Sequence, residues 1–200
     1  VQVLSAAALR ELTGFDFHRG CLAAAPRAGV ADALPEPVRA RLRAEGGVVL
    51  VADGLSDPRN VGALVRTARA LGAEDVVVGA RGADPFSRRA VRASMGHVFH
   101  LPVVVSSRLV TDVRSLRATL AARLLVADER GDDVRSLSLP GSGCTLLAVG
   151  NEGAGASAEL RAVADESVAI PMAAGVDSLN VVVAAGILLQ ALGGAPPSSR

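Results

Sequence analysis

Hydrophobic and polar positions alternate along the chain in blocks that predict strands and helices in turn. Short apolar runs bounded by glycine or polar residues predict strands buried on both faces, at residues 48–52, 75–78, 98–105, 124–127, 145–149 and 168–170. Longer segments between these runs predict helices at residues 61–71, 87–94, 110–122 and 179–192. This alternation predicts an α/β fold with helices on both faces of a mainly parallel sheet.

The beginning of the chain breaks this alternation and predicts a separate region. Ser5 is placed to cap a short helix at residues 6–12, Gly14 is placed to end it, and an apolar run at residues 21–25 predicts a small strand. The prolines and the glycine within residues 26–37 are typical of a linker. We therefore predict a remnant of an N-terminal domain at 1–28, a linker with a helix at 29–45, the main domain at 46–193 and a disordered tail at 194–200.

The size and composition of the chain suit one domain with a buried core, since half of its 200 residues are hydrophobic and the mean hydropathy is +0.38. No apolar run reaches the roughly 18 residues of a membrane-spanning helix, and no signal-peptide pattern opens the chain. We therefore expect a cytoplasmic protein without a membrane partner. Cys21 and Cys144 lie far apart in apolar stretches, which favours reduced thiols. Because the chain begins at Val1, we expect that an upstream segment is missing.

The basic residues are all arginines, and the absence of lysine excludes a Schiff-base enzyme and a Walker-type nucleotide site. His18, His97 and His100 form no cluster with carboxylates or cysteines at ligand spacing, so we expect no metal. With a net charge of only +1, a nucleic-acid partner would have to meet locally clustered arginines. Side chains on which bases could stack are limited to Phe15, Phe17, Phe86 and Phe99.

The junction within residues 145–157 is a place where an apolar strand runs directly into a polar, glycine-dense turn. Such a turn can bring bare backbone close to a ligand. Gly153, Gly155 and Ala158 fit the spacing of a dinucleotide-binding turn. That interpretation is disfavoured, because only a short helix precedes the next strand and Met172-Ala173-Ala174 stands where an acid is needed.

Polar loops follow the predicted strands at residues 53–60, 150–157 and 172–180. Since ligands of parallel sheets bind beyond the carboxyl ends of the strands, we expect these loops to form one site. Asn60 can cap the helix after the first loop, and either Asp177 or Ser178 can cap the last helix. The last helix is apolar on every face, which predicts burial in the core or in a subunit contact.

These loops also match a known pattern. The first contains Asn60 and Arg66, the second Gly150-Asn151-Glu152-Gly153, and the third Ile170-Pro171-Met172 followed by Ser178-Leu179-Asn180-Val181. In order and spacing they resemble the three signature motifs of the SpoU/TrmH RNA ribose 2′-O-methyltransferases of the SPOUT class. The resemblance covers residues 46–193, and Asp84-Pro85-Phe86 with Ser94-Met95-Gly96 adds to it.

The resemblance implies a C-terminal trefoil knot in the α/β fold, S-adenosylmethionine (SAM) bound in the knot without a metal, and a homodimer. It further implies transfer of the SAM methyl group to a ribose 2′-hydroxyl of structured RNA. Ribosomal RNA is favoured and transfer RNA comes next, because His18-Arg19-Gly20 resembles the junction behind a small RNA-recognition domain in some members. The alternative is a SAM-binding RNA-binding module without catalysis. We expect the apolar helix at residues 179–192 to form the dimer contact.

Carried over residue by residue, the resemblance implies three overlapping groups of site residues. The acceptor ribose would be surrounded by Arg66, Asn60, Glu152, Ser178 and Asn180. SAM would be held by Val149, Gly150, Asn151, Gly153, Ile170, Pro171, Met172, Ser178 and Leu179. RNA phosphates would be met by Arg59, Arg66, Arg69, Arg88, Arg89 and Arg92.

Arg66 is central to these groups, but a guanidinium with a pKa above about 12 is a poor base at neutral pH. We therefore favour the hypothesis that Arg66 clamps an RNA phosphate beside the reacting ribose while Glu152 positions Arg66 and Asn60. The methyl group of SAM is already activated, so the protein mainly has to align the 2′-hydroxyl with it. A transiently deprotonated Arg66 that acts as the base stays open as the alternative.

Overall fold

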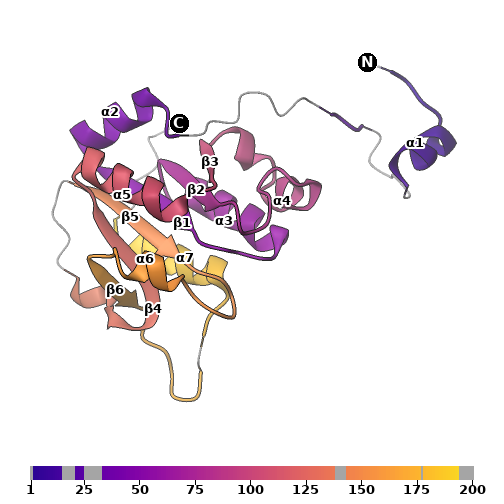
Figure 1. The fold of residues 1–200 in the computed structure, drawn as a ribbon. Helices are drawn as coiled ribbons and strands as arrows, with labels where there is room; N and C mark the ends of the chain where they lie inside the picture. Colours follow the sequence, from indigo (N-terminus) through magenta and orange to yellow (C-terminus); the bar gives the residue numbers. More distant parts are fainter. Residues whose placement is uncertain (1, 15–20, 25–32, 138–142, 177, 194–200) are drawn as a thin grey trace.

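The computed structural model describes residues 2–14, 21–24, 33–137, 143–176 and 178–193. Within this part of the chain, strands form one six-stranded parallel sheet in the order β3-β2-β1-β5-β4-β6 (Figure 1). The strands are β1 Gly47–Ala52, β2 Asp75–Gly79, β3 Val103–Ser106, β4 Arg123–Asp133, β5 Cys144–Val149 and β6 Glu166–Ala169. The predicted α/β class with a parallel sheet is therefore confirmed.

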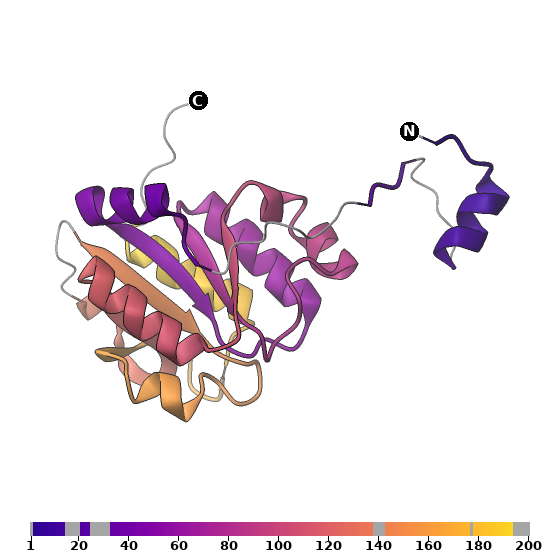
Figure 2. The ribbon, with the colours of Figure 1, turned by 45° about the horizontal axis from the view of Figure 1, so that its top comes forward.

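Helices cover both faces of the sheet (Figure 2). One face carries α2 (Glu36–Glu45), α5 (Leu109–Leu120) and α6 (Ala158–Arg161). The other face carries α3 (Pro58–Ala70), α4 (Arg88–Ala93) and α7 (Val181–Ala191), together with the 3-10 helices η1 (His97–Phe99) and η2 (Val134–Ser136). The short α1 (Ala6–Thr13) has the predicted cap at Ser5 and the predicted end at Gly14, but it buries no residue.

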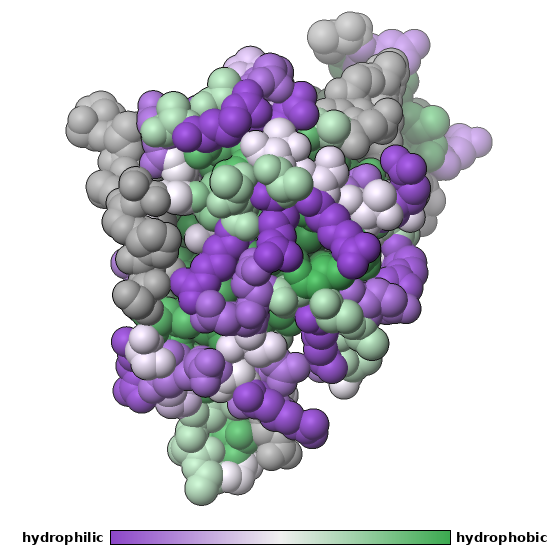
Figure 3. All heavy atoms as spheres, turned by 60° about the vertical axis from the view of Figure 1, so that its left-hand side comes forward, coloured by the Kyte–Doolittle hydropathy of each residue, from purple (hydrophilic) through white to green (hydrophobic). Residues whose placement is uncertain are grey.

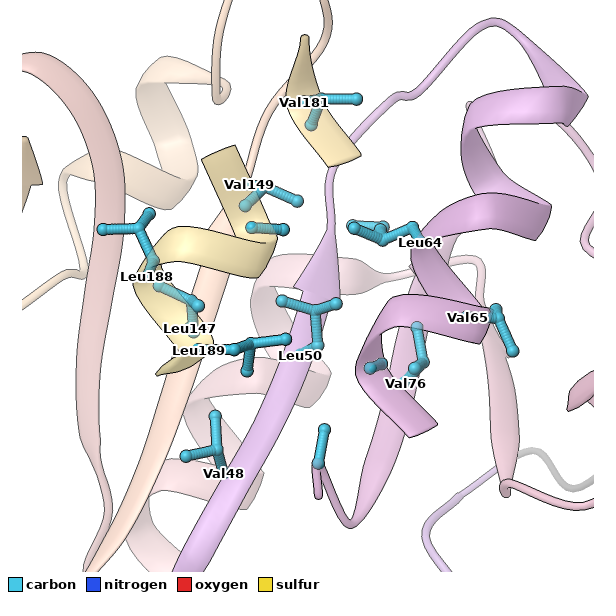
Figure 4. Close-up of a cluster of buried hydrophobic side chains, with 14 of the residues drawn as sticks. Val48, Leu50, Leu64, Val65, Val76, Leu147, Val149, Val181, Leu188 and Leu189 are labelled. Atoms are coloured by element: carbon cyan, nitrogen blue, oxygen red, sulfur yellow. The ribbon is translucent and has the colours of Figure 1, made fainter. Parts of the chain in front are cut away.

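The core lies between the sheet and its two helical layers, and β1 shows how the strands divide their side chains. Leu50 belongs to the cluster beneath α3 and α7, whereas Val49 and Val51 belong to the cluster beneath α2 and α5. Figure 4 shows Leu50, with Leu64 of α3 and other labelled residues of the first cluster. Burying a leucine or valine contributes about 1.5–3 kcal/mol. The face turned forward in Figure 3 is, by contrast, largely hydrophilic, with hydrophobic areas between the polar side chains.

Two helix starts differ from the predictions. α3 begins at Pro58 rather than near residue 61, because a proline has no N–H that needs a partner in the first helical position. The Asp57 carboxylate caps this helix by accepting from the N–H of Arg59 at 2.8 Å, so the cap is not Asn60. α7 likewise begins at Val181, and its cap is Asn180 rather than Ser178.

The strand predictions were wrong in three places. The apolar run at residues 98–105 splits into η1 and β3, because only its second half lies beside β2 and pairs with it. β4 does not stop at Ala127 but continues to Asp133 through an irregularity that lets it pair with β6 again. Residues 21–24 form no strand, since no strand of the described residues lies beside them.

Some predictions fall outside the described residues: Ala25 in the small strand, the His18-Arg19-Gly20 junction, Phe15, Phe17, the candidate cap Asp177 and the tail at 194–200. Among the residues that are described, no helix is long and apolar enough to cross a membrane.

Candidate functional site

The loops that follow β1 and β5 are tied together at the carboxyl end of the sheet. The carboxylate of Asp53, directly after β1, accepts from the N–H of Ser157 at 2.8 Å. Asn151 is the second residue after β5, and its side-chain amide donates to the carbonyl oxygen of Gly54 at 2.9 Å. Asp53 is 4% exposed, so its bond is largely shielded from water. The first two predicted loops therefore form one rigid edge.

The turn after β5 folds back on itself, and its glycines are required for different reasons. Asn151 and Gly155 exchange backbone hydrogen bonds of 2.9 and 2.8 Å, and the Asn151 side chain accepts from the N–H of Gly153 at 2.9 Å. A Cβ on Gly150 would lie 1.9 Å from the backbone nitrogen of Ala156, so a side chain at position 150 would prevent the fold-back. A Cβ on Gly153 would meet only the Asn151 side chain at 3.6 Å, which leaves the backbone there open to a ligand.

A chain of hydrogen bonds connects the start of α7 with the β5 turn. Asn180 accepts from the N–H of Val182 at 2.9 Å and donates its amide to the side-chain oxygen of Asn60 at 3.3 Å. Asn60 then donates to the Glu152 carboxylate at 2.8 Å. Because a backbone N–H can only donate and a carboxylate can only accept, both asparagine amides have one consistent orientation. The chain thus brings together Asn60, Glu152 and Asn180, which come from all three predicted motifs.

The second oxygen of the Glu152 carboxylate is held by Ser56, which the sequence analysis did not single out. Ser56 donates its backbone N–H at 3.4 Å and its hydroxyl at 3.3 Å. Partial burial raises the pKa of Glu152, but the hydrogen bonds from Asn60, from its own N–H and from Ser56 outweigh burial, so the net shift lowers it. Glu152 is therefore ionised at neutral pH and serves as a fixed acceptor rather than as a strong base.

A cavity of about 420 Å³ lies beside this hydrogen-bond chain, a size common for small-molecule and cofactor sites. It is lined by the proposed SAM-binding residues other than Pro171, namely Val149, Gly150, Asn151, Gly153, Ile170, Met172, Ser178 and Leu179. Pro171 lines an adjoining hollow, together with Met172. Open backbone at the turn with apolar walls fits a nucleoside-type cofactor. In the described part of the chain, no group of three or more His, Cys, Asp or Glu residues could hold a metal.

The cavity also contains residues that the sequence analysis missed. Ala127, Asp128, Glu129 and Arg130 line one wall, because β4 continues past Ala127 and carries them along the cavity. Asp128 is held by Arg161 at 3.2 Å. The polar character of Asp128, Glu129 and Arg130, directly after the predicted apolar strand, was a usable signal, since it matches the pattern of the three predicted loops.

The six arginines of the predicted RNA-binding group are all exposed: Arg59, Arg66, Arg69, Arg88, Arg89 and Arg92. Arg59 pairs with Asp57 at 2.7 Å. Hydrogen bonds from Arg59 lower the pKa of Asp57, and the charge of Arg89 adds to the effect, so Arg89 lies near the start of α3. Arg66 does not line the cavity and makes no hydrogen bond or ion pair within the described residues. The partners of Glu152 there are Asn60 and Ser56, and Arg66 is not among them.

Comparison with known proteins assigns this chain to a family. The sequence model of the SpoU rRNA Methylase family matches residues 47–190. An uncharacterized tRNA/rRNA methyltransferase of Mycobacterium tuberculosis is 36% identical over 186 residues, which are 92% of this chain and 62% of the relative. The 23S rRNA (adenosine(1067)-2′-O)-methyltransferase of Streptomyces laurentii is 37% identical over 170 residues, which are 81% of this chain and 60% of the relative.

Solved structures agree with this assignment. The SpoU methyltransferase AviRb from Streptomyces viridochromogenes, solved in complex with its cofactor AdoMet, superposes with a TM-score of 0.67 at 35% identity. The match covers 74% of this chain and 57% of AviRb. The chain thus spans less than two thirds of the length of these relatives. It belongs to the SpoU rRNA methylase family.

Proposed function

We propose that this chain transfers the methyl group of SAM to a ribose 2′-hydroxyl of structured RNA, with ribosomal RNA preferred over transfer RNA. The observation that carries the proposal is the hydrogen-bond chain from Asn180 through Asn60 to Glu152, which joins three loops at the rim of a cofactor-sized cavity. A relative from Streptomyces laurentii is named as a 23S rRNA 2′-O-methyltransferase, and this supports the preference for ribosomal RNA.

SAM would occupy the cavity beside the β5 turn. The backbone at Gly153 is open on the ligand side, while Ile170, Met172 and Leu179 supply apolar walls for an adenosine. SAM supplies a methyl group that is activated on a sulfonium. The chain itself has to orient the ribose, exclude water and accept or relay one proton.

Orientation of the ribose would fall to the hydrogen-bond chain. Asn60 and Asn180 have both amides fixed by their neighbours, so any remaining donor or acceptor capacity points in a defined direction. Ser178 lines the cavity and offers a hydroxyl near the same rim. Pre-set polar groups of this kind lower the entropic cost of aligning the 2′-hydroxyl.

Arg66 would clamp an RNA phosphate beside the reacting ribose. Its guanidinium is exposed and has no protein partner in the described residues, so it is available to an external anion. A carboxylate that held Arg66 would compete with this role, and Glu152 instead binds Asn60 and Ser56. A short-lived neutral Arg66 acting as base is the competing mechanism.

A homodimer through the α3–α7 layer forms part of the proposal. Val183 and Ile187 are one turn apart on α7 and are 50% and 40% exposed, although α7 buries its opposite side against α3. Such a stripe favours a second copy of the chain. Because both side chains point away from the core, Val183→Glu should yield a folded monomer by light scattering. A monomeric mass for the unaltered chain would contradict the dimer.

The C-terminal part of the domain would form a trefoil knot. It is supported by the path of the chain, which passes from β5 across β4 to β6 and then returns so that α7 contacts β5 and η2. The likeness to the solved structure of AviRb, which covers 74% of this chain, also supports it.

The decisive test is methyl transfer from labelled SAM to separated ribosomal and transfer RNA pools, with the modified nucleotide mapped. We expect the unaltered chain to label ribosomal RNA and Arg66→Ala to lose at least about a hundredfold in kcat/KM, because clamp and base are both removed. Arg66→Lys separates the two mechanisms. A lysine clamp leaves the pH profile unchanged with a raised RNA KM, whereas a lysine base makes turnover rise through a pKa near or below about 10.

SAM binding without transfer to any RNA would favour the binding module instead. Calorimetry on the unaltered chain makes this distinction, since it measures SAM affinity without turnover. Binding that required an added divalent metal would contradict the metal-free site.

A further inference from the structure

Two large apolar side chains are exposed in the segment that runs from the end of α4 through η1. Met95 is 69% exposed and Phe99 is 68% exposed, whereas Val98 between them is buried. Phe86, the other phenylalanine in the described residues, packs against the core. Leaving a phenylalanine and a methionine in water forgoes about 25 cal/mol per Å² of apolar area. We call the side chains of Met95 and Phe99 the apolar platform.

The backbone beneath the platform is held by hydrogen bonds within α4 and η1. The N–H of Met95 donates to Arg92 at 3.2 Å, and the N–H of Phe99 donates to Gly96 at 3.0 Å. Ser94 is fully buried, and its hydroxyl donates to the carbonyl oxygen of Val91 at 2.8 Å. A surface that is fixed before binding loses little conformational entropy when a ligand arrives.

The segment of the chain that carries the platform is positively charged. Residues 81–100 contain four arginines and a single acidic residue, Asp84, although the whole chain has a net charge of only +1. Arg88, Arg89 and Arg92 lie exposed on the α4 helix that leads into the platform. An exposed aromatic side chain that follows an arginine-rich helix combines two features with which proteins hold unpaired nucleotides, because the base can stack and the phosphates can meet the cations.

The α4 helix that leads into the platform packs on α3, the helix that follows the loop after β1 (Figure 1). A Cβ on Gly62 would lie 2.1 Å from the carbonyl oxygen of Ala90, so the two helices touch backbone to backbone. Gly62 is two residues beyond Asn60, and Arg89 acts electrostatically on Asp57 at the start of the same helix. An RNA that places its acceptor ribose at Asn60 would therefore pass close to α4.

We propose that the apolar platform stacks with one unpaired base of the RNA, other than the nucleotide that is methylated. The proposal rests on the proposed function for the identity of the ligand as RNA. The platform would select a structured RNA that has a second, unpaired nucleotide besides the acceptor, because a base inside a duplex cannot offer its face to Phe99. Arg89 and Arg92 would meet the flanking phosphates.

The test uses the full 200-residue chain and a single-stranded oligoadenylate of about twelve nucleotides that carries one 2-aminopurine, whose fluorescence is quenched by stacking. We expect Phe99→Ala to raise the Kd at least about fivefold, the lower end of base–aromatic stacking, and to abolish the extra quenching. Phe99→Tyr keeps an aromatic face and should bind like the unaltered chain. Phe99→Leu keeps the apolar character without the ring and should resemble Phe99→Ala.

The matched control is an oligonucleotide of the same length without bases, whose affinity should be the same for Phe99→Ala and for the unaltered chain. If Phe99→Ala weakened the binding of both oligonucleotides equally, or weakened neither, the stacking proposal would be overturned. Loss of the dimer in Phe99→Ala with unchanged RNA affinity would also overturn it, because the surface would then face a second copy of the chain.

Methyl transfer separates this proposal from the proposed function. If the unaltered chain labels RNA while Phe99→Ala keeps the same Kd and KM, the platform fails and the function stands. If base-dependent binding is lost in Phe99→Ala but the unaltered chain transfers no methyl group, the platform stands and the function fails.

Discussion

The two ends of the parallel sheet each bury a carboxylate, but only the one at the carboxyl end has a hydrogen-bond donor of normal geometry. Asp53, at the carboxyl end of β1, is 4% exposed and accepts a hydrogen bond from the N–H of Ser157. Asp75, at the amino end of β2, is fully buried, and neither carboxyl oxygen has a partner of normal geometry in the described residues. Burial raises the pKa of Asp75 to about 8, opposed only weakly by the N–H of Val76.

The difference follows from what each end of the sheet presents. Loops at the carboxyl end carry polar side chains and backbone N–H groups that satisfy an ionised group, and the same loops form the candidate site. The amino end is closed by packed apolar residues and by ion pairs farther out, such as Arg41 with Glu74. The polar groups at the carboxyl end of the sheet are therefore arranged around the candidate site, whereas Asp75 at the amino end is buried without a compensating partner.

Asn60→Ala should have the largest effect, because it cuts the hydrogen-bond chain at the carboxyl end in two places. We expect methyl transfer to fall at least about a hundredfold, which corresponds to about 2.7 kcal/mol of transition-state stabilisation. The melting temperature should hardly change, since the bonds lie at a half-exposed rim. Assays of kcat/KM and thermal unfolding on the same sample measure both quantities. A variant with normal turnover would show that the chain of bonds has no catalytic role.

Asp75→Asn tests the amino end and should change stability rather than activity. A raised folded pKa means that Asp75 favours folding fully below its ordinary pKa, and that this contribution is lost as the pH rises to about 8. Between about pH 6 and pH 7.5 the unaltered chain should lose about 2 kcal/mol of unfolding free energy from this group, at about 1.4 kcal/mol per pH unit.

The measurement is urea unfolding of both proteins at the two pH values. Asp75→Asn cannot ionise, so its stability should change less over the same interval. Identical pH slopes for the two proteins would mean that Asp75 is ionised in the folded state, and the contrast with Asp53 would disappear.

Glu152→Gln should have the smallest effect, because glutamine can still accept from the Asn60 amide with its oxygen. Its NH2 group would, however, face the N–H of Ser56, and one bond would be lost. We expect about a tenfold loss in kcat/KM, or about 1.4 kcal/mol. Glu159→Gln is the matched control, since Glu159 is an exposed acid on α6 that does not line the cavity. Equal losses in the two variants would exclude a specific role for Glu152.

Much of the fold could be predicted because it depends on local patterns. The apolar run ending at Val149 is buried on both faces, as its continuous hydrophobicity predicted. The motifs around Asn60 and Gly150 identified the family because their order and spacing are properties of the chain. The ends of strands and helices were predicted less well where pairing with a neighbouring strand sets them. The apolar run at residues 98–105, for example, splits into η1 and β3.

The tertiary structure alone decided which groups meet. Asn60 and Glu152 are 92 positions apart, and no periodicity could show that one donates to the other or that Ser56 holds the second oxygen. The exposure of Phe99 and the unpaired burial of Asp75 depend likewise on which surfaces other elements cover. Sequence periodicity reports the side of an element that faces a core, because that is a local repeat. Hydrogen bonding and burial are settled by segments that folding brings together from distant parts of the chain.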